Sequence, residues 1–190
     1  MAPWNTASPD KWVDQYADSL FSYAIVRVND REAARDLVQE TFLSALQNLA
    51  SFKGESSEKT WLTAILKNKI IDRYRRAATS MVALSDPADA AELDQFFDEE
   101  GEWKSSAGPS DWSASPHEQY RSKEFHEILR KCLATLKAQW RSIFTLKYLE
   151  EMDSEEICKE LGISASNYWV IMHRAKLMIR RCVEKNWLHA

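Results

Sequence analysis

The sequence is poor in glycine and proline and has no long apolar run. It has four glycines and five prolines among 190 residues, which disfavours a fold built on glycine-rich loops. No apolar run approaches the roughly 20 residues that a membrane span needs, and no basic segment followed by an apolar core opens the chain. Because 45% of the residues are hydrophobic, there is apolar material for one ordinary domain or two small helical ones. We therefore expect a soluble, cytoplasmic protein without membrane insertion.

Cysteine is also scarce. The chain has three cysteines: Cys132, Cys158 and Cys182. Their odd number and wide spacing fit neither a disulfide framework nor a paired-cysteine zinc motif, so we expect reduced, half-buried helix residues. The alternative is a metal site formed by four scattered residues: His117, His126, Cys132 and His173. No two of them have the spacing of a recognised ligand pair, so the sequence predicts no metal and no other cofactor.

Charge is unevenly distributed, although the net charge is only -4. Residues 1–76 hold 11 basic and 10 acidic side chains, residues 77–116 hold 1 and 9, and residues 117–190 hold 13 and 10. The middle segment also contains three prolines and several serines, a composition typical of a flexible linker. We therefore expect a first domain over 1–76, an acidic flexible linker over 77–116 and a second domain over 117–190.

The acidic linker nevertheless contains large apolar side chains: Leu93, Phe96, Phe97, Trp103 and Trp112. Side chains of this size in an acidic segment indicate that parts of the linker dock onto another surface. A short helix is expected near Asp89–Phe97.

Apolar residues recur every three or four positions in both flanking domains, which predicts an all-α fold. The first domain is expected to have three to four helices, with helices over about 11–28, 30–49 and 59–76, the second capped by Asn29 or Asp30. In the second domain we expect helices over about 117–136, 138–150, 154–161 and 164–186.

The last two helices have the signature of a helix-turn-helix. Asp153 or Ser154 caps the shorter helix, Gly162 supplies a left-handed turn, and Ser164 starts the second helix. At 100° per residue, one side of that helix should face the core: Tyr168, Ile171, Met172, Ala175, Met178 and Ile179. The other side mixes basic and large apolar groups: Asn167, Trp169, Val170, His173, Arg174, Lys176, Leu177, Arg180 and Arg181. This mixture favours an interaction surface over a solvated face with chance apolar residues.

The second helix of a helix-turn-helix enters the major groove of DNA. The expected base readers lie in its first turns, and they are Ser166, Asn167, Trp169, Val170 and His173. The expected phosphate ligands follow, and they are Arg174, Lys176, Arg180 and Arg181. Ser164, at the start of the helix, completes this DNA-binding set.

Motifs in both domains resemble the extracytoplasmic-function sigma factors of bacterial RNA polymerase. In the second domain the similar motifs are Ser154-Glu155-Glu156-Ile157, Leu161-Gly162-Ile163-Ser164 and His173-Arg174-Ala175-Lys176, which resemble the family's promoter -35 reading domain. In the first domain they are Asp36 to Leu43, Phe52 to Ser57, Thr60-Trp61-Leu62 and Asn68 to Arg76, which resemble its core-binding and -10 segments. The resemblance covers residues 11–76 and 117–185, in family order.

The resemblance implies that the second helix binds the clamp helices of the largest polymerase subunit, and that the flap of the polymerase is a further contact. The implied core-binding residues are Asp36, Gln39, Glu40 and Leu43. Three of these, spaced by four and three residues, share one helical stripe that could grip a partner helix. Solvated surface charges are the alternative reading of this stripe.

The resemblance also implies a -10 DNA-binding set: Lys53, Gly54, Ser56, Ser57, Asn68, Asp72, Arg73, Arg75 and Arg76. The loop over residues 52–59 would capture a base flipped out of the stack, while the arginines hold the phosphates of the strand. Trp61 could stack on a base, but its place inside an apolar helix favours a core role.

Such a protein opens promoters without a catalytic residue, because captured bases stabilise the melted strand. The carboxylate pairs Glu99-Glu100 and Glu155-Glu156 are therefore explained by solvation and the helix dipole. The family resemblance further implies a linker that enters the polymerase and control by an anti-sigma protein. The competing hypotheses are an operator-binding regulator that works without polymerase and, more distantly, a hydrolase or nuclease, for which the sequence offers no metal or nucleophile constellation.

The sequence departs from the family pattern at the start of the recognition helix. The family has a small residue, valine, a basic residue and a hydroxyl residue where this chain has Asn167, Tyr168, Trp169 and Val170. The missing basic residue predicts either a different -35 sequence or a helix face that also contacts a protein.

Overall fold

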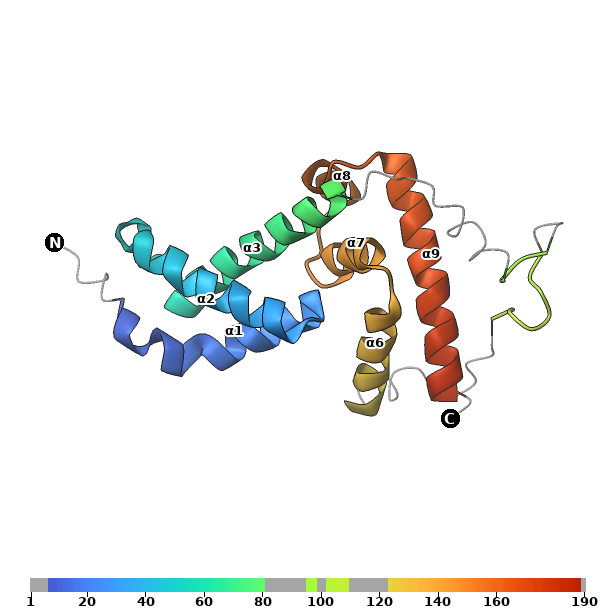
Figure 1. Cartoon of the computed structure of the whole chain (residues 1–190), viewed down its shortest axis with the longest axis horizontal. Helices are drawn as coiled ribbons and strands as arrows, with labels where there is room; N and C mark the ends of the chain where they lie inside the picture. Colours follow the sequence, from blue (N-terminus) through green and yellow to red (C-terminus); the bar gives the residue numbers. More distant parts are fainter. Residues whose placement is uncertain (1–6, 81–94, 99–101, 110–122, 189–190) are drawn as a thin grey trace. The chain divides into compact units, whose positions relative to one another are not determined.

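The computed structural model describes residues 7–80, 95–98, 102–109 and 123–188, and the regular elements in these ranges are helices. One isolated β-bridge joins Phe97 to Trp103. The predicted all-α class is confirmed. Contacts divide the chain into two compact units, Met1–Arg76 and Ala77–Ala190, which are described separately below (Figure 1).

The first unit contains α1 (Trp12–Val28), α2 (Arg31–Gln47) and α3 (Glu58–Ser80), with short 3-10 helices at Pro9–Lys11 and Leu49–Ser51. Asn29 ends α1 in the left-handed conformation, at φ 53°, and Asp30 begins α2. The Asp30 carboxylate accepts hydrogen bonds from the backbone N–H groups of Glu32 and Ala33, at 3.0 and 3.1 Å. The three predicted helices are confirmed, with α3 extending four residues beyond its predicted end.

The carboxylate of Glu58 joins the start of α1 to the start of α3. Glu58, the first residue of α3, accepts hydrogen bonds from Ser8 N and Trp12 Nε1, both at 2.7 Å, and from Tyr16 Oη at 3.2 Å. Trp12 itself is only 1% exposed. Burial alone would raise the pKa of Glu58, but the three hydrogen bonds outweigh burial and hold it below its ordinary value. The start of α1 is therefore fixed to the start of α3.

The second unit contains α6 (Lys123–Thr135), α7 (Ala138–Tyr148), α8 (Ser154–Leu161) and α9 (Ala165–Val183), followed by a π-helical turn at Glu184–Leu188. Residues 117–122 of the predicted first helix lie outside the described residues. The helix-turn-helix is confirmed in α8 and α9. Gly162 takes φ 65° between them, and Ser164 Oγ accepts a hydrogen bond from Asn167 N at 3.2 Å, which caps α9.

A disulfide joins Cys132 of α6 to Cys182 of α9, whose Cα atoms are 5.7 Å apart. The prediction of three reduced cysteines is therefore wrong for this pair. The cause is the packing of α6 against α9, which brings together residues 50 positions apart in the sequence. Cys158 has a free thiol, and burial, with a smaller effect of Glu155, raises its pKa.

Two pieces of the predicted linker, residues 95–98 and 102–109, dock on the second unit. Phe96 is 1% exposed, and Lys104 N donates to Phe96 O at 3.0 Å as the chain turns back. The expected docking of large linker side chains is confirmed. The expected helix over 89–97 is wrong at residues 95–97, which form a turn and a bridge. Residues 89–94, which include Leu93, lie outside the described residues, and so does Trp112.

Candidate functional site

The recognition helix α9 has two different sides. The side predicted to face the core is largely buried: Tyr168, Ile171, Met172, Ala175 and Ile179 are all under 9% exposed, and Met178 is half-buried. Leu177 is also buried, at 7%, so its assignment to the outer face is wrong. The difference arises because α9 packs against α6, α7 and α8 together, which covers a wider arc than one apolar stripe.

Two large apolar side chains stand on the exposed side. Trp169 is 60% exposed and Val170 is 46% exposed, and the Trp169 ring lies edge-on to Tyr168 at a centroid distance of 5.1 Å. Ser166 and His173 are exposed beside them. Burial of Tyr168 in the core therefore fixes the neighbouring indole in place while leaving it open to a partner.

Asn167 lies at the first turn of the same helix. Its backbone N–H is used by the Ser164 cap, whereas its side-chain Nδ2 is buried and has no hydrogen-bond partner among the described residues. Because this atom is buried, the amide can pair with an adenine edge only after the side chain turns outward.

The basic residues of α9 differ in their exposure and in the contacts that they already make. Lys176 is exposed, with Nζ 5.9 Å from the centroid of the Tyr148 ring, and Arg174 is half-buried. Arg180 is instead engaged by the linker: its Nη2 donates to Ala107 O at 2.7 Å, and Trp103 covers its guanidinium at 4.3 Å. The sequence pattern could not reveal this engagement, because the partners lie more than 70 residues away.

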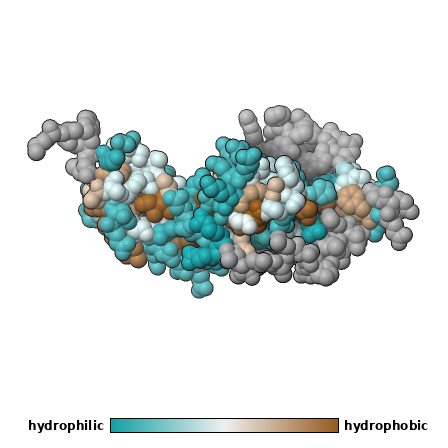
Figure 2. All heavy atoms as spheres, turned by 90° about the horizontal axis from the view of Figure 1, so that it is seen from above, coloured by the Kyte–Doolittle hydropathy of each residue, from teal (hydrophilic) through white to brown (hydrophobic). Residues whose placement is uncertain are grey.

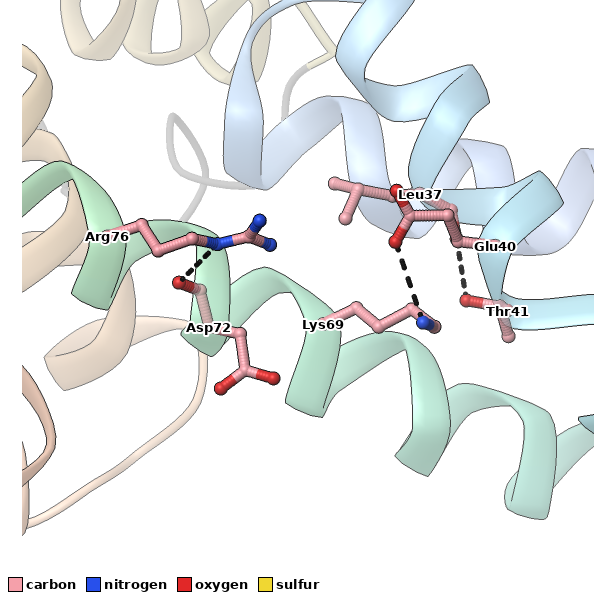
Figure 3. Close-up of polar contacts among 6 residues, drawn as sticks. All are labelled: Leu37, Glu40, Thr41, Lys69, Asp72 and Arg76. Carbon is pink, nitrogen blue, oxygen red and sulfur yellow. Dashed lines mark hydrogen bonds and ion pairs between the residues drawn. The ribbon is translucent and has the colours of Figure 1, made fainter. Parts of the chain in front are cut away.

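On α2, the four predicted core-binding residues are all exposed, and Leu43 is exposed at 59%. Glu40 forms an ion pair with Lys69 of α3, at 3.5 Å between Oε2 and Nζ (Figure 3). Thr41, on the buried side, donates to Leu37 O at 2.7 Å. Lys69 was missed by the sequence analysis, since no motif marks a residue whose role is to hold a carboxylate of another helix.

The loop before α3 begins with Lys53 and Gly54. The glycine adopts a backbone φ of 71°, which residues other than glycine rarely adopt. Ser56 is exposed. Ser57 Oγ accepts from Thr60 N at 3.1 Å and therefore caps α3. The loop thus presents exposed polar groups from a fixed helix start.

Three residues of the -10 set share one exposed face of α3: Asn68, Asp72 and Arg75. Asp72 pairs with Arg75 at 2.8 Å. Arg76 Nε donates to Asp72 O at 3.4 Å (Figure 3). Arg73 and Arg76 are exposed as well. The structure thus arranges these arginines along one helix end, where a nucleic-acid strand could meet several of them.

Trp61 packs between two aromatic rings, at centroid distances of 5.0 Å from Phe52 and 6.0 Å from Trp12. It is half-buried, which agrees with the predicted core role. Its contact with Phe52 fixes the start of the loop that precedes α3.

The surface shows hydrophobic side chains as separate patches within a hydrophilic exterior (Figure 2). Within the described part of the chain, no three His, Cys, Asp or Glu residues gather where they could hold a metal ion, and His117 lies outside it. None of the described helices combines the length and the apolar character that a bilayer crossing would require.

Comparison with known proteins identifies relatives over most of the chain. The family models Sigma-70 region 2 and Sigma-70, region 4 match residues 12–79 and 126–179. A probable RNA polymerase sigma factor of Haemophilus influenzae is 41% identical over 176 residues, which cover 93% of this chain and 90% of that protein. RNA polymerase sigma factor YlaC of Bacillus subtilis is 34% identical over 173 residues, 90% of each chain. ECF RNA polymerase sigma factor SigX of the same species is 27% identical over 171 residues, 90% of this chain and 81% of that protein.

Proposed function

This chain belongs to the sigma factors of bacterial RNA polymerase, of the extracytoplasmic-function type, and we propose how its surfaces divide the work of promoter recognition. It joins core polymerase, binds promoter DNA and directs transcription initiation. Residues 1–76 bind core polymerase and the -10 element, residues 117–190 read the -35 element, and residues 77–116 link them. The observation that carries this division is the exposed face of α9, with Trp169 60% exposed on a helix whose start is capped by Ser164.

The -35 element is read by the first two turns of α9. Asn167 pairs with an adenine edge, while Trp169 and Val170 contact thymine methyl groups, and Lys176 neutralises phosphate without contributing sequence information. Because two apolar groups replace the usual polar readers, the preferred -35 element is rich in A·T pairs.

Core polymerase binds to the exposed face of α2. The Glu40 side chain remains 55% exposed although it pairs with Lys69 of α3, so its carboxylate can also meet a partner helix, and the apolar Leu43 one turn later contributes buried area. In the second unit, a groove lined by Phe125, Phe144 and Ile179 supports a contact with the polymerase flap. The two contacts involve different units, so each can be disrupted separately.

The -10 element is opened and held by the loop before α3 and by the exposed face of α3. Ser56 and the backbone around Gly54 receive a flipped base, and Asn68 pairs with its edge. Arg73, Arg75 and Arg76 hold the phosphates of the single strand. Opening follows from preferential binding of the melted strand, and the chain needs no catalytic residue or cofactor of its own.

Activity is controlled by an anti-sigma protein that covers the polymerase-binding face in the cytoplasm. The exposed apolar side chains on α2 and α9, Leu43, Trp169 and Val170, support such a partner. Affinity purification of the chain from uninduced cells tests this idea. Recovery of core polymerase alone, with constitutive activity, would contradict it.

The proposed function is tested by adding the purified chain to core RNA polymerase and mapping transcription starts on fragmented genomic DNA. We expect starts that share two elements about one and a half to two helical turns apart. Alanine at Trp169 should change the upstream element alone. Specific DNA binding by the chain without polymerase, and no specific starts with it, would identify an operator-binding regulator instead.

A further inference from the structure

The loop over residues 53–57, which we call the -10 loop, places none of its residues in the core. All of them are exposed or half-buried: Lys53, Gly54, Glu55, Ser56 and Ser57. A segment with few buried contacts opens easily, whereas a binding pocket is most selective when it is formed in advance. The conformation of the -10 loop therefore depends on what holds its two ends, at Phe52 and Glu58.

The end of the -10 loop is held by the Glu58 carboxylate. Its Oε1 accepts hydrogen bonds from Trp12 Nε1 and from Ser8 N, both at 2.7 Å. Trp12 is 1% exposed and lies 46 positions earlier in the chain, so its indole is a fixed point supplied by α1. Hydrogen bonds to a carboxylate are stronger than those between neutral groups. The residue that follows the -10 loop therefore has a defined position relative to α1.

The start of the -10 loop is held through the same indole. Phe52 is 6% exposed and packs on the Trp61 ring at a centroid distance of 5.0 Å. Trp61 in turn meets the Trp12 ring edge-on, at a centroid distance of 6.0 Å. At both distances aromatic rings attract one another beyond the effect of the area that they bury. Trp12 is thus connected to both ends of the -10 loop, to one by a hydrogen bond and to the other through a single ring.

We propose that Trp12 and Glu58 are positioning residues for reading the -10 element, which fix the two loop ends so that the preferred base enters a pocket that is already formed. The inference rests on the proposed capture of a base by this loop. Trp12 is buried, so it acts through the loop and not on DNA. The cost of ordering a loosened loop falls only on a base that enters it. Loosening therefore lowers the preference for that base, whereas a general loss of folded protein lowers initiation on all promoters alike.

Trp12→Phe tests this role, because it removes the Nε1–H donor and keeps an aromatic ring against Trp61. Full-length wild-type and variant chains would be assembled with core polymerase and given two templates in one reaction. One template is a promoter taken from the mapped starts, and the other carries a single substituted -10 base and gives a transcript of different length. The ratio of the two transcripts does not depend on the fraction of active protein. At the captured base we expect this ratio to fall about fivefold, which corresponds to one typical hydrogen bond.

Tyr16→Phe is the matched control, since it removes a hydrogen bond to the same carboxylate. It deletes the 3.2 Å bond from Tyr16 Oη to Glu58 Oε2 and leaves the indole bonded to Oε1. Tyr16→Phe should therefore keep the -10 ratio close to the wild-type value. In Trp12→Phe, discrimination at the -35 element should be unchanged, because another unit reads it.

A double variant tests whether Trp12 and Glu58 act through one bond. Glu58→Ala removes the acceptor that Trp12→Phe leaves without its donor. Adding Trp12→Phe to Glu58→Ala should therefore lower the -10 ratio no further than Glu58→Ala alone. Independent, additive losses would contradict a shared role.

The outcomes separate this role from the function on which it rests. An unchanged -10 ratio in Trp12→Phe, with discrimination intact in the wild-type holoenzyme, would overturn the role and leave base capture by the loop standing. An equal fall in Tyr16→Phe would also overturn it, since the link to the loop start would then be irrelevant. A wild-type holoenzyme that initiates without preference at any -10 position would overturn base capture itself, and this role with it.

Discussion

Reduction of the Cys132–Cys182 disulfide should destabilise the second unit by an amount set by the length of chain that the bridge closes. The two cysteines are 50 positions apart. In the chain-entropy treatment, a closed loop of this length restricts the unfolded state enough to stabilise the folded one by about 4 kcal/mol. For a unit of this size, such a loss corresponds to a fall of about 15 °C in its melting temperature.

The measurement is thermal unfolding of the purified chain, followed by circular dichroism with and without a dithiol reductant. Cys132→Ser should melt at the lower temperature in both conditions, whereas Cys158→Ser, which alters the free thiol of the same unit, should respond to the reductant as the wild-type chain does. Thiol counting under denaturing, non-reducing conditions should give one free thiol per chain. Three free thiols, or equal melting temperatures with and without reductant, would refute the reasoning.

The other predictions concern the first unit and the two partner surfaces. Because the pKa of Glu58 is lowered in the folded state, its contribution to stability is present above the unfolded pKa and is lost as pH falls through the folded pKa. Glu58→Gln should therefore cost about 1 kcal/mol at pH 7 and less at pH 3, in urea titrations of the first unit. Leu43→Ala should weaken core polymerase binding about tenfold in a competition assay, since a 59% exposed leucine is buried there, while the melting temperature stays unchanged. Trp169→Ala should reduce discrimination at one or two -35 positions by about 1–3 kcal/mol in a binding-site selection experiment, and unaltered selectivity would remove this residue from the readers.

The parts of the fold that depend on neighbouring residues could be predicted from the sequence. Asp30, Gly162 and Ser164 mark helix ends through interactions within four residues, and the structure uses all three as expected. The all-α class likewise followed from apolar spacing along each helix. Helix caps and apolar spacing depend only on residues close together in the chain, so they can be identified from a single sequence.

Contacts between distant segments could not be predicted in the same way. The hydrogen bond from Arg180 to Ala107 spans 73 residues, and the disulfide spans 50. Their formation depends on how helices pack, which spacing along the chain does not encode. Large aromatic residues in an acidic segment did indicate that the linker docks, but not that α9 receives it. The roles of individual DNA-binding and polymerase-binding residues stay predictions.

The carboxylate of Glu58 also has a consequence for how the protein is made. Its hydrogen bond to Ser8 N spans 50 residues, so the first unit cannot close until Glu58 has emerged from the ribosome. At about 5–20 residues per second, the start of α1 waits about 3–10 s for its partner. During this interval Trp12 has no core to enter and is open to chaperones. Translation speed between these two positions therefore sets how long the nascent chain exposes its first helix.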